Sequence, residues 1–225
     1  MNQISLRSII MMIPILFIAL PVHEFAHGWV AYKMGDPTAK YAGRLTLNPF
    51  KHLDLMGVMM MFIAGVGWAK PVPVNSTYLR NRRTGMILIS LAGPLSNLIL
   101  GFLGLFIWGI IVKLVSIEVI VVNSAVMADA LINGVDFLQT FVIVNISLAV
   151  FNLIPVPPLD GSRVLSSFVP EESYYRFARY EQYIGLAFLV LVVVLPGNLF
   201  SRFISFFAIP IYNSMALTIR LIFGL

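Results

Sequence analysis

Residues 19–32 read ALPVHEFAHGWVAY, a stretch that is apolar enough to enter a membrane yet holds two histidines and a glutamate. His23 and His27 are four residues apart, so a helix places them on one face, one turn from each other. Glu24 lies beside them. Because a charged group at the bilayer centre costs roughly 2.5–3.5 kcal/mol, ionisable residues inside a span indicate function. The stretch predicts a transmembrane helix that carries a site.

The rest of the chain is also strongly apolar. Of its 225 residues, 59% are hydrophobic and 11% are charged, whereas soluble domains have roughly 45–50% apolar and about 25% charged residues. No long polar linker or charge run divides it. We expect an all-α polytopic membrane protein, with one integral domain over residues 1–225, a core at 9–161 and C-terminal helices at 173–225.

The number of spans follows from the lengths of the apolar stretches, since a crossing helix needs about 20 mainly apolar residues. Stretches of suitable length lie at 9–32, 84–113 and 135–155, and residues 183–195 and 199–225 carry the remaining apolar material. We therefore expect about four to five transmembrane helices. Whether 199–225 crosses or lies in the interface stays open. Residues 55–68 are apolar but short, so we expect them to form a re-entrant or interfacial element between the first two core spans.

A parity argument supports this reading of residues 55–68. If the histidine pair and Asp160 belong to one site, the helices at 9–32 and 135–155 run in the same direction. An odd number of crossings must then separate them. The helix at 84–113 supplies one crossing, and a second would place Asp160 on the wrong side.

The distribution of charge gives an orientation. Loops 33–54 and 69–83 are basic, whereas 114–134 contains Glu118 and Asp129 and no lysine or arginine. By the positive-inside rule, residues 33–83 are cytoplasmic and the N-terminus is outside, in what we expect to be the cell membrane. The net charge of +5 comes from basic residues in such short loops, so we expect no nucleic-acid partner.

The pattern H-E-x-x-H is typical of zinc peptidases, in which both histidines bind Zn²⁺ and the glutamate is the general base. A catalytic zinc needs a third protein ligand. The chain has no cysteine, which leaves Asp54, Asp136 and Asp160 as acidic candidates. Asp160 follows a proline-rich break at 155–158, and Gly161 after it is expected to permit a turn. From spacing alone, a zinc ligand and an aspartate facing water are equally good readings.

HEFAH (23–27) in a span, followed by FNLIPVPPLDG (151–161), resembles the site-2 protease family of intramembrane zinc metalloproteases, in its compact prokaryotic branch without a PDZ or CBS domain. AGPLSN (92–97) and NPFKHLDLMG (48–57) are similar to further stretches of that branch. The resemblance implies a β-structured re-entrant element and one Zn²⁺ held by His23, His27 and Asp160. It also implies Glu24 as catalytic base and cleavage of transmembrane substrates within the bilayer.

Three further polar residues are candidates for the site. The resemblance implies that Asn152 holds substrate or stabilises the oxyanion, and it favours a similar role for Asn97 over a plain helix–helix hydrogen bond. His52 is equally well read as a residue that supports a metal ligand or contacts the substrate, and as a solvated interfacial histidine.

Two other functions stay open. A membrane metal-ion transporter could use the same histidines and aspartate, but it predicts polar positions staggered through the bilayer. A catalytically dead scaffold would be expected to have lost HExxH or LDG, and both are intact. The sequence therefore predicts an intramembrane zinc metalloprotease that acts on transmembrane proteins in the lipid bilayer.

Overall fold

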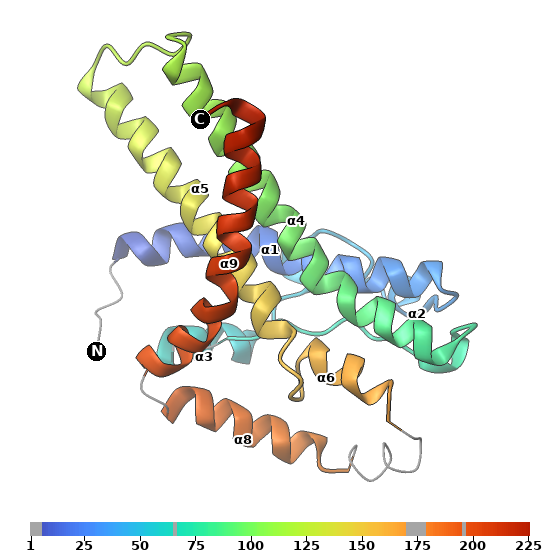
Figure 1. Ribbon diagram of the computed structural model, residues 1–225. Helices are drawn as coiled ribbons and strands as arrows, with labels where there is room; N and C mark the ends of the chain where they lie inside the picture. Colours follow the sequence, from blue (N-terminus) through green and yellow to red (C-terminus); the bar gives the residue numbers. More distant parts are fainter. Residues whose placement is uncertain (1–5, 65–66, 170–178, 195–196) are drawn as a thin grey trace.

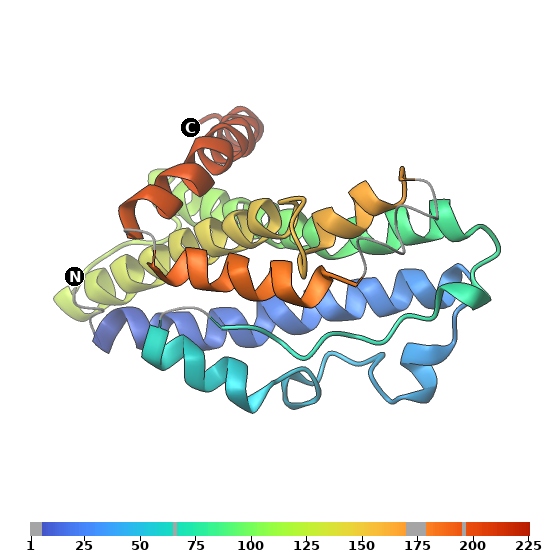
Figure 2. The same ribbon diagram turned by 90° about the horizontal axis from the view of Figure 1, so that it is seen from below.

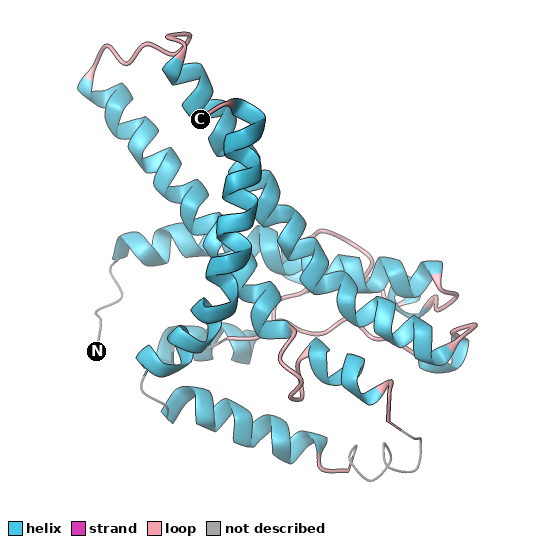
Figure 3. Cartoon of the chain, in the orientation of Figure 1, coloured by secondary structure: helices cyan, strands magenta, loops and turns pink. Residues whose placement is uncertain are grey.

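The computed structural model describes residues 6–64, 67–169, 179–194 and 197–225, which are helical and contain no strand (Figure 1, Figure 3). Among them, four helices are long and apolar enough to cross a membrane. These are α1 (Leu6–Lys33), α4 (Arg82–Ser116), α5 (Ala125–Asn152) and α9 (Gly197–Phe223). The all-α prediction is confirmed. The beginning of the expected C-terminal region, at residue 173, lies outside the described residues.

Short elements connect these four helices. They are α2 (Thr38–Tyr41), the 3₁₀ turns η1 (Pro49–Lys51) and η2 (Ser76–Tyr78), α3 (Leu55–Ala64), α6 (Asp160–Ser166) and α8 (Glu181–Val194). α3 has 10 residues and α8 has 14, too few to cross. One isolated antiparallel bridge joins Leu53 to Ala69. A re-entrant path for the segment around α3 stays a prediction.

Side-chain contacts fix the direction of each long helix. α4 packs against α1, α5 and α9 (Figure 1, Figure 2). α1 is antiparallel to α4, because His23 contacts Asn97 while His27 contacts Ile89. A Cβ atom built on Gly101 would contact Ile146, and one on Gly104 would contact Phe141. α5 is therefore antiparallel to α4 and runs in the same direction as α1, as the parity argument requires.

The direction of α9 also follows from side-chain contacts. The rings of Phe151 and Phe200 lie 6.0 Å apart, which places the start of α9 beside the end of α5. A Cβ atom on Gly109 would lie 2.7 Å from Ile219 Cγ2, which places the end of α9 beside the C-terminal part of α4. α9 therefore runs parallel to α4, and the helix expected at 199–225 is long enough to cross.

α5 differs from the sequence prediction at its beginning. It starts at Ala125, ten residues before the expected 135, because the Ser124 side chain accepts a hydrogen bond from Met127 N and caps the helix. Asp129 is consequently helical. The loop at 117–124 retains Glu118, whose φ of 59° is in the left-handed region.

Candidate metal centre

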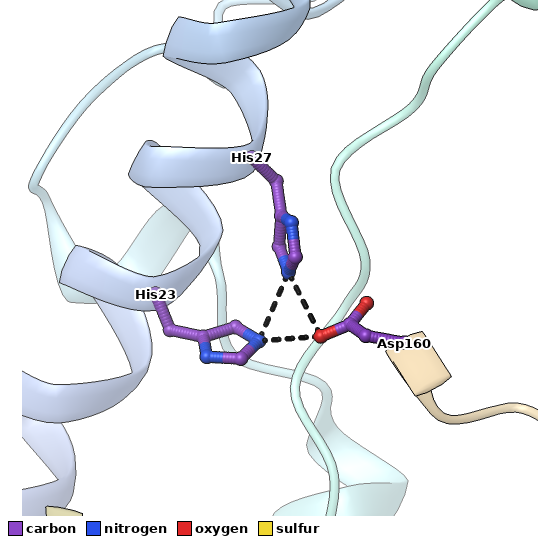
Figure 4. A group of neighbouring side chains, drawn as sticks. All are labelled: His23, His27 and Asp160. Atoms are coloured by element: carbon purple, nitrogen blue, oxygen red, sulfur yellow. Dashed lines mark hydrogen bonds and ion pairs between the residues drawn. The ribbon is translucent and has the colours of Figure 1, made fainter. Parts of the chain in front are cut away.

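Three side chains from two distant parts of the chain meet in the interior (Figure 4). His23 and His27 project from the same side of α1, and Asp160 is the first residue of α6. The Nε2 atoms of His23 and His27 lie 3.0 Å apart, and each of these atoms lies 3.2 Å from Asp160 Oδ2. All three residues are buried. In the described residues, they form the one group of three or more His, Asp or Glu that could share a metal ion.

The chain turns back sharply to bring Asp160 to α1. α5 ends at Asn152, and α6 begins eight residues later at Asp160 and packs against α4. A Cβ atom on Gly161 would overlap the carbonyl oxygen of Leu153, so glycine is required for this close approach. The expectation of a turn at Gly161 was wrong, because this residue is helical and serves packing instead.

The outer nitrogen of each imidazole faces an acceptor. His27 Nδ1 lies 2.6 Å from the carbonyl oxygen of Ile89, and His23 Nδ1 lies 2.9 Å from Asn97 Oδ1. An oxygen in these positions only accepts a hydrogen bond, so Nδ1 carries the proton in both rings. In the neutral form of each ring, the lone pair of Nε2 then points toward the other ring and toward Asp160.

This acceptor-rich cluster fits a zinc ion. With both rings neutral, two imidazole lone pairs and a carboxylate converge on one point, an arrangement that a cation would stabilise. Zinc at about 2.0–2.1 Å from tetrahedral ligands would separate those ligands by about 3.3–3.4 Å. The observed separations of 3.0–3.2 Å are close to that value.

The carboxyl group of Asp160 is suited to be a ligand at neutral pH. A divalent cation held between the three side chains would keep this group ionised, because a carboxyl group binds a metal ion in its deprotonated form. Asp160 is therefore a carboxylate when such an ion is bound.

Gly93 of α4 forms the floor of the cluster. A Cβ atom built there would overlap His27 Nε2 and lie 2.6 Å from His23 Nε2. Any larger residue would therefore compete for the space between the rings.

Glu24 is half-buried and points to a different partner. Its Oε2 accepts a hydrogen bond of 2.9 Å from Val72 N, in the proline-flanked segment 69–75. Arg44 donates to Lys70 O at 2.6 Å, and Asp36 accepts from Asn75 N at 2.7 Å. Three side chains thus hold this segment beside α1. Sequence reasoning did not identify Val72.

The remaining candidates have different positions. Asn97 is fully buried and contacts His23. Asn152 is half-buried at the end of α5, and its Nδ2 donates to Leu148 O in the same helix. His52 is buried, and its Nε2 bonds to Thr46 O at 2.8 Å, within its own loop. Of these three, Asn97 has a hydrogen bond to a residue of the cluster.

Comparison with known proteins gives the family. The family model of peptidase family M50 matches residues 11–192, which include the whole cluster. The chain belongs to peptidase family M50, the site-2 proteases. This M50 peptidase is a zinc metalloprotease and an integral multi-pass membrane protein.

Curated relatives agree with that assignment. YwhC of Bacillus subtilis is 42% identical over 184 residues, 81% of this chain and 80% of that protein. Rip2 of Mycobacterium tuberculosis is 31% identical over 186 residues, 80% of this chain and 64% of that protein. MJ0392 of Methanocaldococcus jannaschii is 28% identical, and the match covers 42% of its length. All three names contain "zinc metalloprotease". No solved structure matches the chain.

Proposed function

We propose that this M50 peptidase cleaves peptide bonds within or near transmembrane segments of membrane proteins, with zinc bound by His23, His27 and Asp160. One observation carries the proposal: these three side chains meet beside α1, a helix that is long and apolar enough to span the membrane. Bound zinc would polarise the scissile carbonyl and lower the pKa of water to about 7.

Glu24 is proposed as the general base. It adjoins the ligand His23 on α1, and a carboxylate there can accept the proton of the attacking water and deliver it to the departing amine. The hydrogen bond from Val72 N supports this role, because it fixes one carboxylate oxygen and leaves the other oxygen for the proton.

The segment 69–75 is proposed to hold the substrate in an extended form, as in recognition by strand addition. On one edge of this segment, Lys70 N donates to His52 O, Lys70 O accepts from Arg44, and Val72 N donates to Glu24. Successive residues of an extended chain point to opposite edges, where Pro71 and Pro73 offer carbonyl oxygens and no N–H. A substrate strand would donate its own N–H groups there and keep its carbonyls free for attack.

Asn152 is proposed to contact the substrate or the oxyanion. It ends α5 immediately before the chain turns toward Asp160. Its side-chain amide bonds to Leu148 O in its own helix, and rotation would free this donor for a substrate carbonyl.

The orientation proposed for the membrane follows the basic loops. The basic loops at 33–54 and 69–83 lie in the cytoplasm, and α1, α4, α5 and α9 cross the cell membrane in alternating directions. The same single integral domain, over residues 1–225, is proposed. A transporter would need several sites through the bilayer, whereas the described residues hold one such group.

The proposed reaction is tested with purified protein and a single-span membrane protein in detergent, with product masses determined by mass spectrometry. We expect the cleaved bond to lie within or next to the apolar segment of the substrate. Cleavage confined to a water-soluble tail, or none by zinc-loaded protein, would contradict the proposal. A substrate with N-methyl groups flanking the cleaved bond should have a lower kcat/KM if segment 69–75 binds its N–H groups.

A further inference from the structure

The contact between His23 and Asn97 uses the amide oxygen of Asn97 and leaves its amide nitrogen unpaired. Asn97 is fully buried between helices, and its Oδ1 bonds to His23 Nδ1. Its Nδ2 is buried and has no hydrogen-bond partner. An unpaired buried donor is destabilising, so a partner for Nδ2 would stabilise both the helix packing and the side-chain rotamer of Asn97.

Asn145 of α5 has the complementary shortage. It is fully buried, and its Nδ2 donates to Phe141 O in its own helix at 2.8 Å. Its Oδ1 is buried and has no partner. One unpaired donor and one unpaired acceptor therefore lie in the interior of the same helix bundle, on two helices that pack against each other.

Gly101 locates Asn145 relative to Asn97. Gly101 follows Asn97 by one turn on the same face of α4, and a Cβ atom built on it would lie 3.9 Å from Asn145 Cβ. Asn145 is thus about one helical turn from Asn97 along the α4–α5 interface. One buried water with two such partners spans a gap of that size.

We propose that Asn145 is a positioning residue for His23 and acts through Asn97. Its Oδ1 accepts a hydrogen bond from one buried water, and that water accepts a hydrogen bond from Asn97 Nδ2. This holds Asn97 Oδ1 against His23 Nδ1. The proton then stays on Nδ1, and the lone pair of Nε2 stays directed at the metal position. Asn97 is accordingly a positioning residue as well, and its burial within the chain of contacts favours this role over contact with the oxyanion.

The inference rests on the proposed zinc site but not on proteolysis, so the test measures metal affinity. Groups that orient metal-binding histidines typically change metal affinity by about 10–100-fold. The dissociation constant of zinc is measured for the full chain in detergent by competition with a chromophoric chelator. The visible spectrum of bound Co²⁺ reports the geometry of the ligands.

The variants form a double-mutant cycle. Asn97→Leu is expected to weaken zinc binding by about 10–100-fold and Asn145→Leu by about 3–10-fold. The double variant should bind zinc no more weakly than Asn97→Leu, because Asn145 acts only through Asn97. Ser96→Ala is the control, since Ser96 Oγ bonds to Gly93 O within its own helix, and it should bind zinc as the wild type does.

Three outcomes would overturn the inference. The first is an unchanged zinc affinity in Asn145→Leu, and the second is that Asn145→Leu weakens zinc binding by the same factor whether or not Asn97 is present. The third is that Ser96→Ala weakens zinc binding as much as Asn145→Leu does. If Asn145→Leu does not fold, Asn145→Ser replaces it, because serine keeps a polar group but withdraws the oxygen from Asn97, and the same losses are expected. If the wild type does not bind zinc, the proposed metal site itself is contradicted. This result differs from failure of the inference alone, in which the wild type still binds zinc.

Discussion

The backbone of Gly93 lies directly against Nε2 of His27, the nitrogen proposed to bind zinc, so closely that a Cβ atom on Gly93 would overlap it. This contact joins α4 to the HEFAH helix at the level of the proposed zinc. It makes the geometry of the cluster depend on a residue that offers no side chain.

Gly93→Ala should therefore damage the metal site more than the fold. The added methyl group would separate His23 from His27, and we expect zinc affinity to fall by more than about tenfold, as for loss of a group that orients a ligand. Zinc content after chelator treatment measures this. Gly134→Ala is the control, because no atom lies within 4 Å of a Cβ there. Equal zinc retention in both variants would contradict the arrangement.

Val72→Pro should impair turnover while zinc stays bound. Proline removes the N–H that bonds to Glu24 Oε2, and the flanking Pro71 and Pro73 already favour an extended backbone. A hydrogen bond to a charged group contributes about 1.5–3 kcal/mol, so we expect kcat to fall by about 10–100-fold. Val72→Ala keeps the N–H and should retain most of kcat. A similar loss in the alanine variant would show that packing alone matters.

Asn152→Asp tests the role proposed for the end of α5. The substitution keeps the size of the side chain but removes the amide donor, and loss of one oxyanion donor typically lowers kcat by about 10²–10³-fold. Zinc content should not change. Asn133→Asp, an exposed amide-to-acid change near the start of the same helix that keeps the oxygen bonded to Arg7, should leave kcat unaltered. Normal cleavage by Asn152→Asp would contradict a contact with the substrate or the oxyanion and leave Asn152 only a structural role at the end of α5.

The proposed orientation can be measured without background, because the chain has no cysteine. Lys40→Cys in α2 and Glu118→Cys in the loop between α4 and α5 place single thiols at exposed positions on opposite sides. A membrane-impermeant maleimide should label the thiol at 118 in intact cells, and the thiol at 40 only after permeabilisation. The reverse pattern would show that the basic loops face outward.

The spacing of charges and apolar stretches was sufficient to predict the architecture. The separation of His23 from His27 by one turn identified the helix face. The need to bring Asp160 to that face gave the relative directions of α1 and α5. Both follow from helical periodicity and from the thickness of a bilayer, which do not depend on the details of packing. The family match at residues 11–192 agrees with the function predicted from those motifs.

Contacts between backbone and side chain could not be predicted in this way. The hydrogen bond between Val72 N and Glu24 depends on the path of an irregular segment, and no periodic pattern reports it. The start of α5 at Ala125 depends on the cap at Ser124, ten residues before the apolar stretch becomes evident. Gly161 looked like a turn residue because sequence alone does not show the nearby Leu153 carbonyl.

The central claim is tested most directly by comparing the wild type with Glu24→Gln, with bound zinc and cleavage of a transmembrane substrate measured on the same purified samples. Glutamine keeps the size of the side chain but cannot accept the proton of water. We predict equal zinc in both proteins and cleavage by the wild type alone. Equal cleavage by both proteins would contradict Glu24 as the base, and loss of zinc from the variant would assign Glu24 to the metal site instead.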